Sequence, residues 1–432
     1  HAFKWGYELM RYRINSYSIG DPSGNFSFTS TAGLRPNGTN LPNTGNDFAS
    51  FLVGSISSVT FTQTLNSNLP RSWQHSFYFQ DDWKIHPTLT LNLGLRYSVE
   101  TPPTQKYGFI SIWDPNAIDD NQYTGWSCPP EGCRGAWTHP KGAKPYNTDW
   151  NNYQPRIGLA WHPHQKFVVR SGFALSHVDM KLGFLYTDEL MSRSVTQSRP
   201  TGDPRPLFQL KEGPAPVVYP ALRPDGSVPY VGNPGSHSAN IVDRNLQAAY
   251  TMTWNFGIQY EVSRDYLLEV QYNGSRQVGN SGSLQLNTLP WGYLADDPVA
   301  REAWIPVAQY SRPFPNWGNV YYQGNYGQLS HHSGTVKIEK RFSKGLNFLA
   351  FYTFGKTIDE NVSNMYLERK LNRGRADWDQ THRFSGSMMY EIPIGKGRRF
   401  LNRGGWLNML IGGFDFVWTY SIYSGEPLGI GI

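Results

Sequence analysis

The residues of this chain that could do chemistry gather in one stretch rich in tryptophan and tyrosine. Between Trp113 and Trp150, aromatic and basic side chains surround a pair of cysteines. Exposed aromatic rings can stack on sugar rings or clamp peptides, and basic groups can hold anionic ligands. We therefore predict a substrate-binding surface here, with the candidate residues Trp113, Trp126, Arg134, Trp137, Tyr146 and Trp150. The alternative is that these rings pack the segment against itself and against neighbouring loops.

Cys128 and Cys133 are the two cysteines of the chain and lie five positions apart. Such a pair can close a small loop through a disulfide bond, which requires an oxidising compartment. Two free thiols are the alternative. A zinc site would need further Cys or His ligands at suitable spacing, and His139 stands alone. We predict the disulfide and no metal site.

Other short motifs offer little support for catalysis. Gly355-Lys356-Thr357 resembles the end of a phosphate-binding loop, but Ala350 stands where that motif needs its first glycine. Asp119-Asp120-Asn121 could offer oxygen ligands to Ca²⁺, yet the glycine hinge and closing glutamate of such a site are missing. The sequence contains neither Gly-x-Ser-x-Gly nor His-Glu-x-x-His. We predict no catalytic residue and no cofactor, so the protein is not expected to be an enzyme.

Composition narrows the class of protein further. The 432 residues include 39 Lys and Arg against 33 Asp and Glu, a net charge of +6 without a basic block, so no nucleic acid partner is expected. The 43 glycines and 30 prolines are spread along the chain, which disfavours a helical bundle. No apolar run is long enough for a membrane-spanning helix. A many-stranded β protein remains.

Apolar and polar residues alternate along several segments of the chain. The period of two is without error from Leu89 to Val99 and recurs over 251–262 and 414–422, which is typical of strands with one apolar face. These strands run about 9 to 12 residues, the length that a tilted strand needs to cross a hydrocarbon layer. We predict that these residues face lipid: Leu91, Leu93, Leu95, Tyr97, Trp254, Phe256, Ile258, Phe414, Phe416 and Trp418.

Tight turns alternate with long connections between these strands. The long, irregular, Pro/Gly/Trp-rich connections are residues 100–152, 177–250, 276–319 and 355–381. Short turns on the periplasmic side and long loops outside the cell are typical of outer-membrane barrels, and loops of this length are uncommon in compact soluble domains. In lipid every backbone polar group must be paired within the protein, so a β protein crosses only as a closed barrel. We predict an all-β fold, a large antiparallel transmembrane β-barrel; a soluble β-sandwich or propeller is the alternative.

Several segments resemble the barrel of TonB-dependent outer-membrane receptors, in particular the Oar-like group. They follow one another in the order of that family: 75–84 with 89–97, 153–161, 353–360 and 375–384. The resemblance covers most of the chain. It implies a barrel of about 22 strands with a plugged lumen, located in the bacterial outer membrane. It also implies uptake of a scarce nutrient, energised by contact with TonB.

The sequence departs from this family in strand number and at both ends. About 14 strands of the transmembrane kind are expected, no plug or TonB-contacting segment precedes His1, and the end at Ile432 lacks a closing strand. We therefore expect residues 1–432 to form part of one larger barrel. Its expected partners are outer-membrane lipid, the TonB complex through a plug outside this segment, and a small nutrient, oligosaccharide or peptide.

Two other functions fit the same residues. The barrel could present its loops as an adhesion or assembly surface without transport. A secreted carbohydrate-active β protein is the second alternative, and it would need two convergent carboxylates in a pocket.

Overall fold

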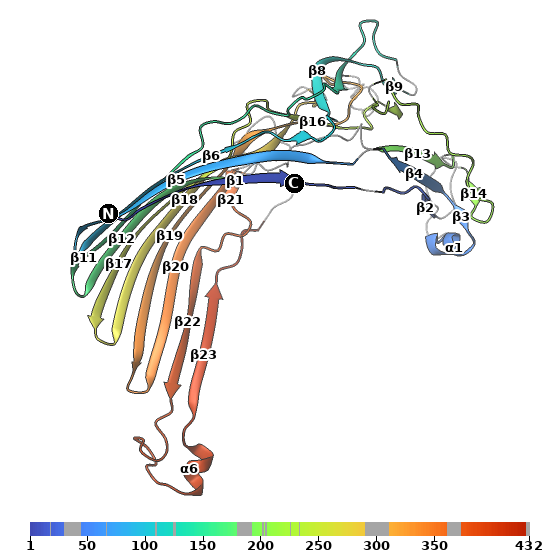
Figure 1. The fold of residues 1–432 in the computed structure, drawn as a ribbon. Coiled ribbons are helices and arrows are strands. Elements are labelled where there is room, and N and C mark those ends of the chain that lie inside the picture. Colours follow the sequence, from blue (N-terminus) through green and yellow to red (C-terminus); the bar gives the residue numbers. More distant parts are fainter. Residues whose placement is uncertain are drawn as a thin grey trace.

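The regular secondary structure of the described residues is almost entirely strand. The computed structural model describes residues 1–17, 19–29, 45–65, 67–108, 110–123, 127–178, 192–200, 203, 205–224, 226–232, 234–289, 311–360 and 373–428. Figure 1 shows a curved wall of long strands with most of its longer connections gathered at one end. Within the described residues, no helix is long and apolar enough to cross a membrane.

The wall is one antiparallel sheet whose long strands follow one another in chain order. They are β1 (Phe3–Arg13), β5 (Pro70–His86), β6 (Leu89–Glu100), β11 (Tyr153–His164), β12 (Phe167–His177), β17 (Tyr250–Ser263), β18 (Tyr266–Gln285), β19 (Val320–Ser343), β20 (Leu346–Glu360), β22 (His382–Glu391) and β23 (Asp415–Tyr423). Short strands β7 (Thr104–Gln105), β16 (Ala239–Val242) and β21 (Arg373–Arg375) bring the sheet to 14 strands. Among the described residues, β1 and β23 form the two edges.

Cross-strand partners place apolar side chains on a single face of this wall. Directly opposed residues of antiparallel strands share a face. One such row reads Leu89, Trp161, Val169, Ile258, Val270, Val336, Tyr352, Phe384 and Ile422. The neighbouring row, on the opposite face, reads Thr90, Ala160, Arg170, Gly257, Gln271, Thr335, Thr353 and Arg383. The wall therefore has one apolar and one polar face.

The residues predicted to face lipid lie on the apolar face, with Phe414 directly before β23. Leu95, Phe256 and Phe416 are 48%, 47% and 49% exposed. In the part of the chain that the structure describes, no second sheet or helix layer covers the apolar rows, so they are not the core of a sandwich or a propeller. Such a face is stable only where the surrounding solvent is itself apolar.

Three tyrosine–histidine pairs mark the loop-side limit of the apolar face. They are Tyr7–His75, Tyr272–His332 and Tyr352–His382, with hydrogen-bond distances of 2.8, 2.7 and 2.9 Å. His75 and His332 each lie 11 residues before the turn-side end of their strand, and His382 lies nine before. This span matches the strand length that crosses a bilayer, and amphipathic rings are favoured at such a boundary.

The two ends of the wall differ in their connections. On one side, the turn side, four connections are two residues long: 87–88, 165–166, 264–265 and 344–345. Lys344 and Gly345 have φ of 53° and 77°, as a type I′ hairpin turn requires. On the other side, the loop side, every described long strand is joined to the next by a long connection. Several strands are longer than the sequence predicts, with 17 residues in β5, 20 in β18 and 24 in β19.

Two predicted loop boundaries, in 276–319 and 355–381, are wrong. Strand β18 continues to Gln285, paired with the first part of β19, and β20 continues to Glu360. The alternation of apolar and polar residues ends at the membrane boundary, because only within the membrane does one face of the strand contact lipid. Backbone hydrogen bonding between strands continues beyond that boundary, since it does not require an apolar face. Residues 14–69 add a long connection that the sequence reading did not identify.

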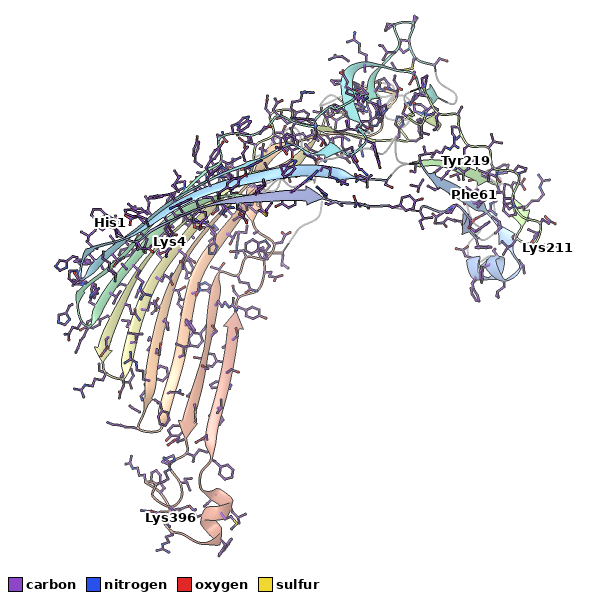
Figure 2. The ribbon with its side chains drawn as sticks, viewed as in Figure 1. His1, Lys4, Phe61, Lys211, Tyr219 and Lys396 are labelled. Atoms are coloured by element: carbon purple, nitrogen blue, oxygen red, sulfur yellow. A yellow bond between two sulfur atoms is a disulfide. The ribbon has the colours of Figure 1, made fainter. Side chains whose placement is uncertain are left out.

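The long connections contain small sheets of their own. One unit combines α1 (Asp47–Leu52) with β2 (Asn25–Ser27), β3 (Ser55–Ile56), β4 (Ser58–Thr64), β13 (Ser192–Ser198) and β14 (Phe208–Gln209) around buried Ile56, Val59 and Phe61. Elsewhere β8 (Ile112–Asp119) pairs with β10 (Cys133–Thr138), and β9 (Gln122–Tyr123) with β15 (Val231–Gly232). Helix α6 (Trp406–Ile411) lies on the turn side. Figure 2 shows the unit around Phe61 apart from the wall.

Candidate binding site in the long loops

Side chains from three long connections pack into one hydrophobic cluster at the loop side of the wall. We call it the loop cluster: Trp113, Trp137, Ala239, Ile241, Leu286, Phe314, Trp317 and Val320. Trp317 and Ala239 are fully buried, and Trp113 is 2% exposed. Burial of this many large apolar groups stabilises the loops against one another.

Polar contacts tie the same three connections together. The indole Nε1 of Trp317 donates to the carbonyl of Gly135 at 2.6 Å. The backbone N–H of Gly318 donates to the carbonyl of His237, in the third connection, at 2.8 Å. Within its own connection, the Asn287 amide donates to the carbonyls of Phe314 and Trp317 at 2.9 and 2.8 Å. Buried polar groups that are satisfied in this way rigidify their surroundings. The loops therefore form a packed body that can hold a preformed site.

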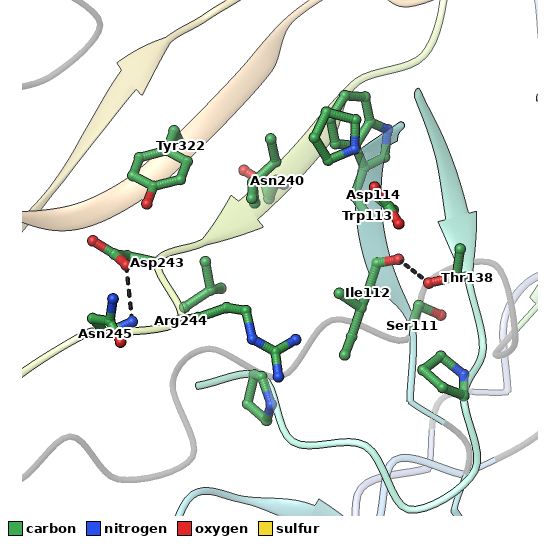
Figure 3. A pocket seen from close by; sticks show the side chains of 15 residues that line it. Ser111, Ile112, Trp113, Asp114, Thr138, Asn240, Asp243, Arg244, Asn245 and Tyr322 are labelled. Atoms are coloured by element: carbon green, nitrogen blue, oxygen red, sulfur yellow. Dashed lines mark hydrogen bonds between the residues drawn. The ribbon is translucent and has the colours of Figure 1, made fainter. Parts of the chain in front are cut away.

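A cavity of about 570 Å³ lies beside the loop cluster. Figure 3 shows it between β8, the end of β16 and Tyr322 of β19. Its polar lining residues are Ser111, Asp114, Thr138, Asn240, Asp243, Arg244, Asn245 and Tyr322, and its apolar ones include Ile112, Trp113 and three prolines. The size and the mixed lining are those of small-molecule sites.

Hydrogen-bond donors and acceptors converge on this cavity. Burial, with the carboxylate of Asp243 beside it, raises the pKa of Tyr322 to about 12. Tyr322 lies in the loop-side part of β19, beyond the apolar face. Its hydroxyl therefore stays protonated at neutral pH. The Asp243 carboxylate also accepts from the backbone N–H of Asn245 at 2.9 Å. Besides hydroxyls, the cavity offers three kinds of polar group. The carboxylates accept hydrogen bonds, the guanidinium donates them, and the amides do both, so together they can recognise a ligand rich in hydroxyl or peptide groups.

The residues predicted to bind substrate separate into buried and exposed ones. Trp113 and Tyr146 are 2% and 1% exposed, and Trp137 is half-buried, so these rings pack inside the loops. Trp113 also borders the cavity. Arg134 and Trp150 are exposed, the latter at 66%. Trp126 lies outside the described residues.

The sequence reading missed the cavity residues contributed by β16 and its following turn. Asn240, Asp243, Arg244 and Asn245 form no motif and lie far along the chain from Trp113. They reach the cavity because β16 pairs with β19 in parallel. No spacing in the sequence indicates that pairing, so no local signal could have found them.

The cysteine pair and the acidic triplet both serve the loop structure. Cys128 and Cys133 are joined by a disulfide bond at the start of β10, whose first residue is Cys133. Arg223 donates to the carboxylate of Asp120 and to the side-chain oxygen of Asn121, both at 2.6 Å. Two of the three candidate Ca²⁺ ligands are thus bound by a guanidinium, and the third, Asp119, accepts from the side-chain amide of Asn316. No cluster of three or more His, Cys, Asp or Glu side chains suited to a metal occurs in the part of the chain that the structure describes.

His237 gives the loops a predicted pH dependence. Its ring lies 4.0 Å from that of Tyr230 and 3.9 Å from that of Trp317, centroid to centroid, and burial lowers its pKa to about 4. Between pH 6.5 and 4 the unfolded loops bind the proton more strongly than the folded loops do. The stability of the folded loops therefore decreases as the pH is lowered through that window. We expect a loss of about 3 kcal/mol in the opening free energy of the loops, measured by hydrogen exchange. His237→Phe should flatten this slope; an unchanged slope in that variant would contradict the assignment.

A wall of long antiparallel strands, apolar on one face and polar on the other, is the architecture of a transmembrane β-barrel. The chain belongs to the outer membrane beta barrel domain family, whose model matches residues 1–432. It is therefore a bacterial outer-membrane protein and not an enzyme. Its turn side is periplasmic and its loop side extracellular. This membership excludes the secreted carbohydrate-active alternative.

The chain is similar to several solved outer-membrane receptors at low identity. The chain is similar to the FrpB iron transporter from Neisseria meningitidis (9% identity, TM-score 0.39, covering 90% of this chain and 38% of that chain). It is also similar to the siderophore receptor PiuA from Acinetobacter baumannii (10%, 0.39, 90% and 41%) and to the ferric yersiniabactin uptake receptor FyuA from Yersinia pestis (9%, 0.36, 91% and 37%). The chain spans only 27% to 41% of the length of the solved structures it resembles. A search of curated proteins finds no match.

Proposed function

We propose that residues 1–432 form part of the barrel wall and the extracellular binding surface of a TonB-dependent receptor of the Oar-like group. Among the described residues, β1 and β23 are edge strands without an outer strand partner, and lipid cannot satisfy the backbone groups of such an edge, so the proposal includes further strands that close the barrel. A plug outside this segment would contact TonB. The receptor would bind a small nutrient, an oligosaccharide or a peptide and pass it inward.

The observation that carries this proposal is the cavity of about 570 Å³ in the extracellular loops. A protein that only crosses the membrane needs no such space above the bilayer. The cavity is lined by Asp114, Asp243 and Asn240 and is held open by the loop cluster. We place the substrate there, with exposed Arg134 and Trp150 as outer contacts.

Asp243→Ala tests the site directly. Loss of one charge-assisted hydrogen bond costs about 1.5–3 kcal/mol, so binding should weaken roughly 10- to 100-fold. The full-length protein in detergent would be screened against oligosaccharides and peptides by calorimetry. The control is Asp203→Ala, because Asp203 pairs with Arg205 and does not line the cavity. Equal affinities for the wild type and Asp243→Ala would refute the site.

Dependence on TonB separates transport from the alternative function. Uptake of the bound compound should stop in cells that lack TonB. An exposed apolar surface on α1 favours adhesion or assembly instead. Phe48 and Leu52 of α1 and the following Val53 are 66%, 67% and 69% exposed. Binding to a macromolecular partner that persists without TonB, with no uptake, would support that second candidate.

A further inference from the structure

The periplasmic connection between β22 and β23 differs from the other turns on its side. The four others that the structure describes have two residues, whereas this one runs through 392–414. Figure 1 shows α6 beyond the periplasmic ends of β22 and β23, and Figure 2 places Lys396 at the same tip. A barrel needs only two residues to reverse a strand here. The additional residues therefore need another explanation, and their chemistry offers one.

This connection exposes large apolar side chains. Trp406, Met409 and Leu410 are 70%, 84% and 62% exposed, and Phe400 and Leu401 are 54% and 59% exposed. Within α6 the one polar side chain is turned toward the connection itself. The side-chain oxygen of Asn408 accepts from the backbone N–H of Lys396 at 2.6 Å. The helix is thus fixed to the preceding turn, while Trp406, Met409 and Leu410 remain exposed.

The same connection is strongly basic. Lys396, Arg398, Arg399 and Arg403 lie within eight positions, and residues 392–414 contain no Asp or Glu. Arg398 pairs with Glu391 of β22 at 2.6 Å. The guanidinium of Arg399 lies 5.5 Å from the ring centroid of Phe400. Cationic and apolar groups are therefore interleaved on one exposed surface.

Both flanking strands cross the outer membrane, so the connection emerges directly at the periplasmic bilayer surface. A segment with exposed large apolar side chains and several cations is suited to the boundary between headgroups and acyl chains. We propose that residues 392–414 form an interfacial anchor on the periplasmic leaflet of the outer membrane. Trp406, Met409 and Leu410 insert below the headgroups, and Lys396, Arg399 and Arg403 bind the phosphates of anionic phospholipids. This proposal requires neither transport nor the extracellular cavity.

A spin label at position 409 tests the anchor. Both cysteines of the chain are already joined in a disulfide, so Met409→Cys provides a single reactive thiol in this segment. The full-length protein, with any other free cysteine replaced by serine, would be reconstituted into phosphatidylcholine vesicles with and without phosphatidylglycerol. We expect the nitroxide to collide with O₂ several-fold more, and with a water-soluble nickel chelate several-fold less, than a label at Gln165→Cys in an exposed two-residue turn. Insertion should deepen with phosphatidylglycerol.

A charge-reversed variant isolates the role of the basic side chains. Lys396→Glu, Arg399→Glu and Arg403→Glu together should abolish the deepening that phosphatidylglycerol causes. Nickel collisions at position 409 equal to those at position 165 would place the segment in water and overturn the proposal. Protection from both reagents would mean that protein covers the segment and would also overturn it. Insertion that ignores phosphatidylglycerol would refute the headgroup contacts.

Discussion

Ile258→Arg is expected to destabilise the assembled barrel by about 2–4 kcal/mol, the cost of a cation on the lipid face near the bilayer midplane. Ile258 lies five residues from the periplasmic end of β17, between Val169 and Val270 of the neighbouring strands. An arginine at this position has no polar side chain directly beside it in its row. Its guanidinium is also too far from either membrane surface to reach water. The free energy of unfolding in phospholipid vesicles, from urea titration, measures the loss.

Gln259→Arg is the matched control, because the same charge one residue later points to the opposite face. Gln259 lies opposite Val168 and Glu269 on the polar side. Glu269 can pair with the new arginine, and water is expected to reach this face. The control should therefore change stability by about 0.5 kcal/mol or less. If both variants lost the same stability, the assignment of faces would be wrong.

The wall was predictable because each of its strands carries its own signal. The alternation over Leu89–Val99 gives strand type, face and environment without knowledge of the neighbours. The outer membrane adds a constraint that a soluble protein lacks, because the length of the apolar stretch is set by the bilayer. For this reason the strands predicted over 89–99, 251–262 and 414–422 agree with β6, β17 and β23 within one residue at each end.

The loops were less predictable because their order comes from contacts distant in sequence. Trp113 looks like an exposed ligand contact in isolation, but Trp317 and Ala239 bury it from two other connections. The aromatic content of the stretch was read correctly, whereas the burial of individual rings depends on partners about 125 to 200 positions away. Asp243 illustrates the same limit, since only the pairing of β16 with β19 brings it to the cavity.

Trp317→Ala is expected to unfold the extracellular loops while leaving the barrel intact. Trp317 is fully buried, and its indole donates to Gly135 across two connections. Truncating a buried tryptophan costs about 3–5 kcal/mol, and here it also leaves the Gly135 carbonyl without its donor. Local opening of the loops requires less free energy than global unfolding of the protein. A loss of this size in the opening free energy is therefore enough to unfold the loops if they fold separately from the barrel. Hydrogen exchange should rise over 111–119, 133–138 and 235–246.

Trp150→Ala provides the control for this variant, because Trp150 is 66% exposed and contributes little packing. It should leave exchange in the loops unchanged, within about 0.5 kcal/mol. Protection of the strands near Ile258 should stay the same in both variants, since the lipid face is independent of the loop cluster. If Trp317→Ala raised exchange in the wall as well, the loops and the barrel would be one cooperative unit. If it raised exchange nowhere, the loop cluster would not be what holds the cavity open, and the proposed binding site would lose its structural basis.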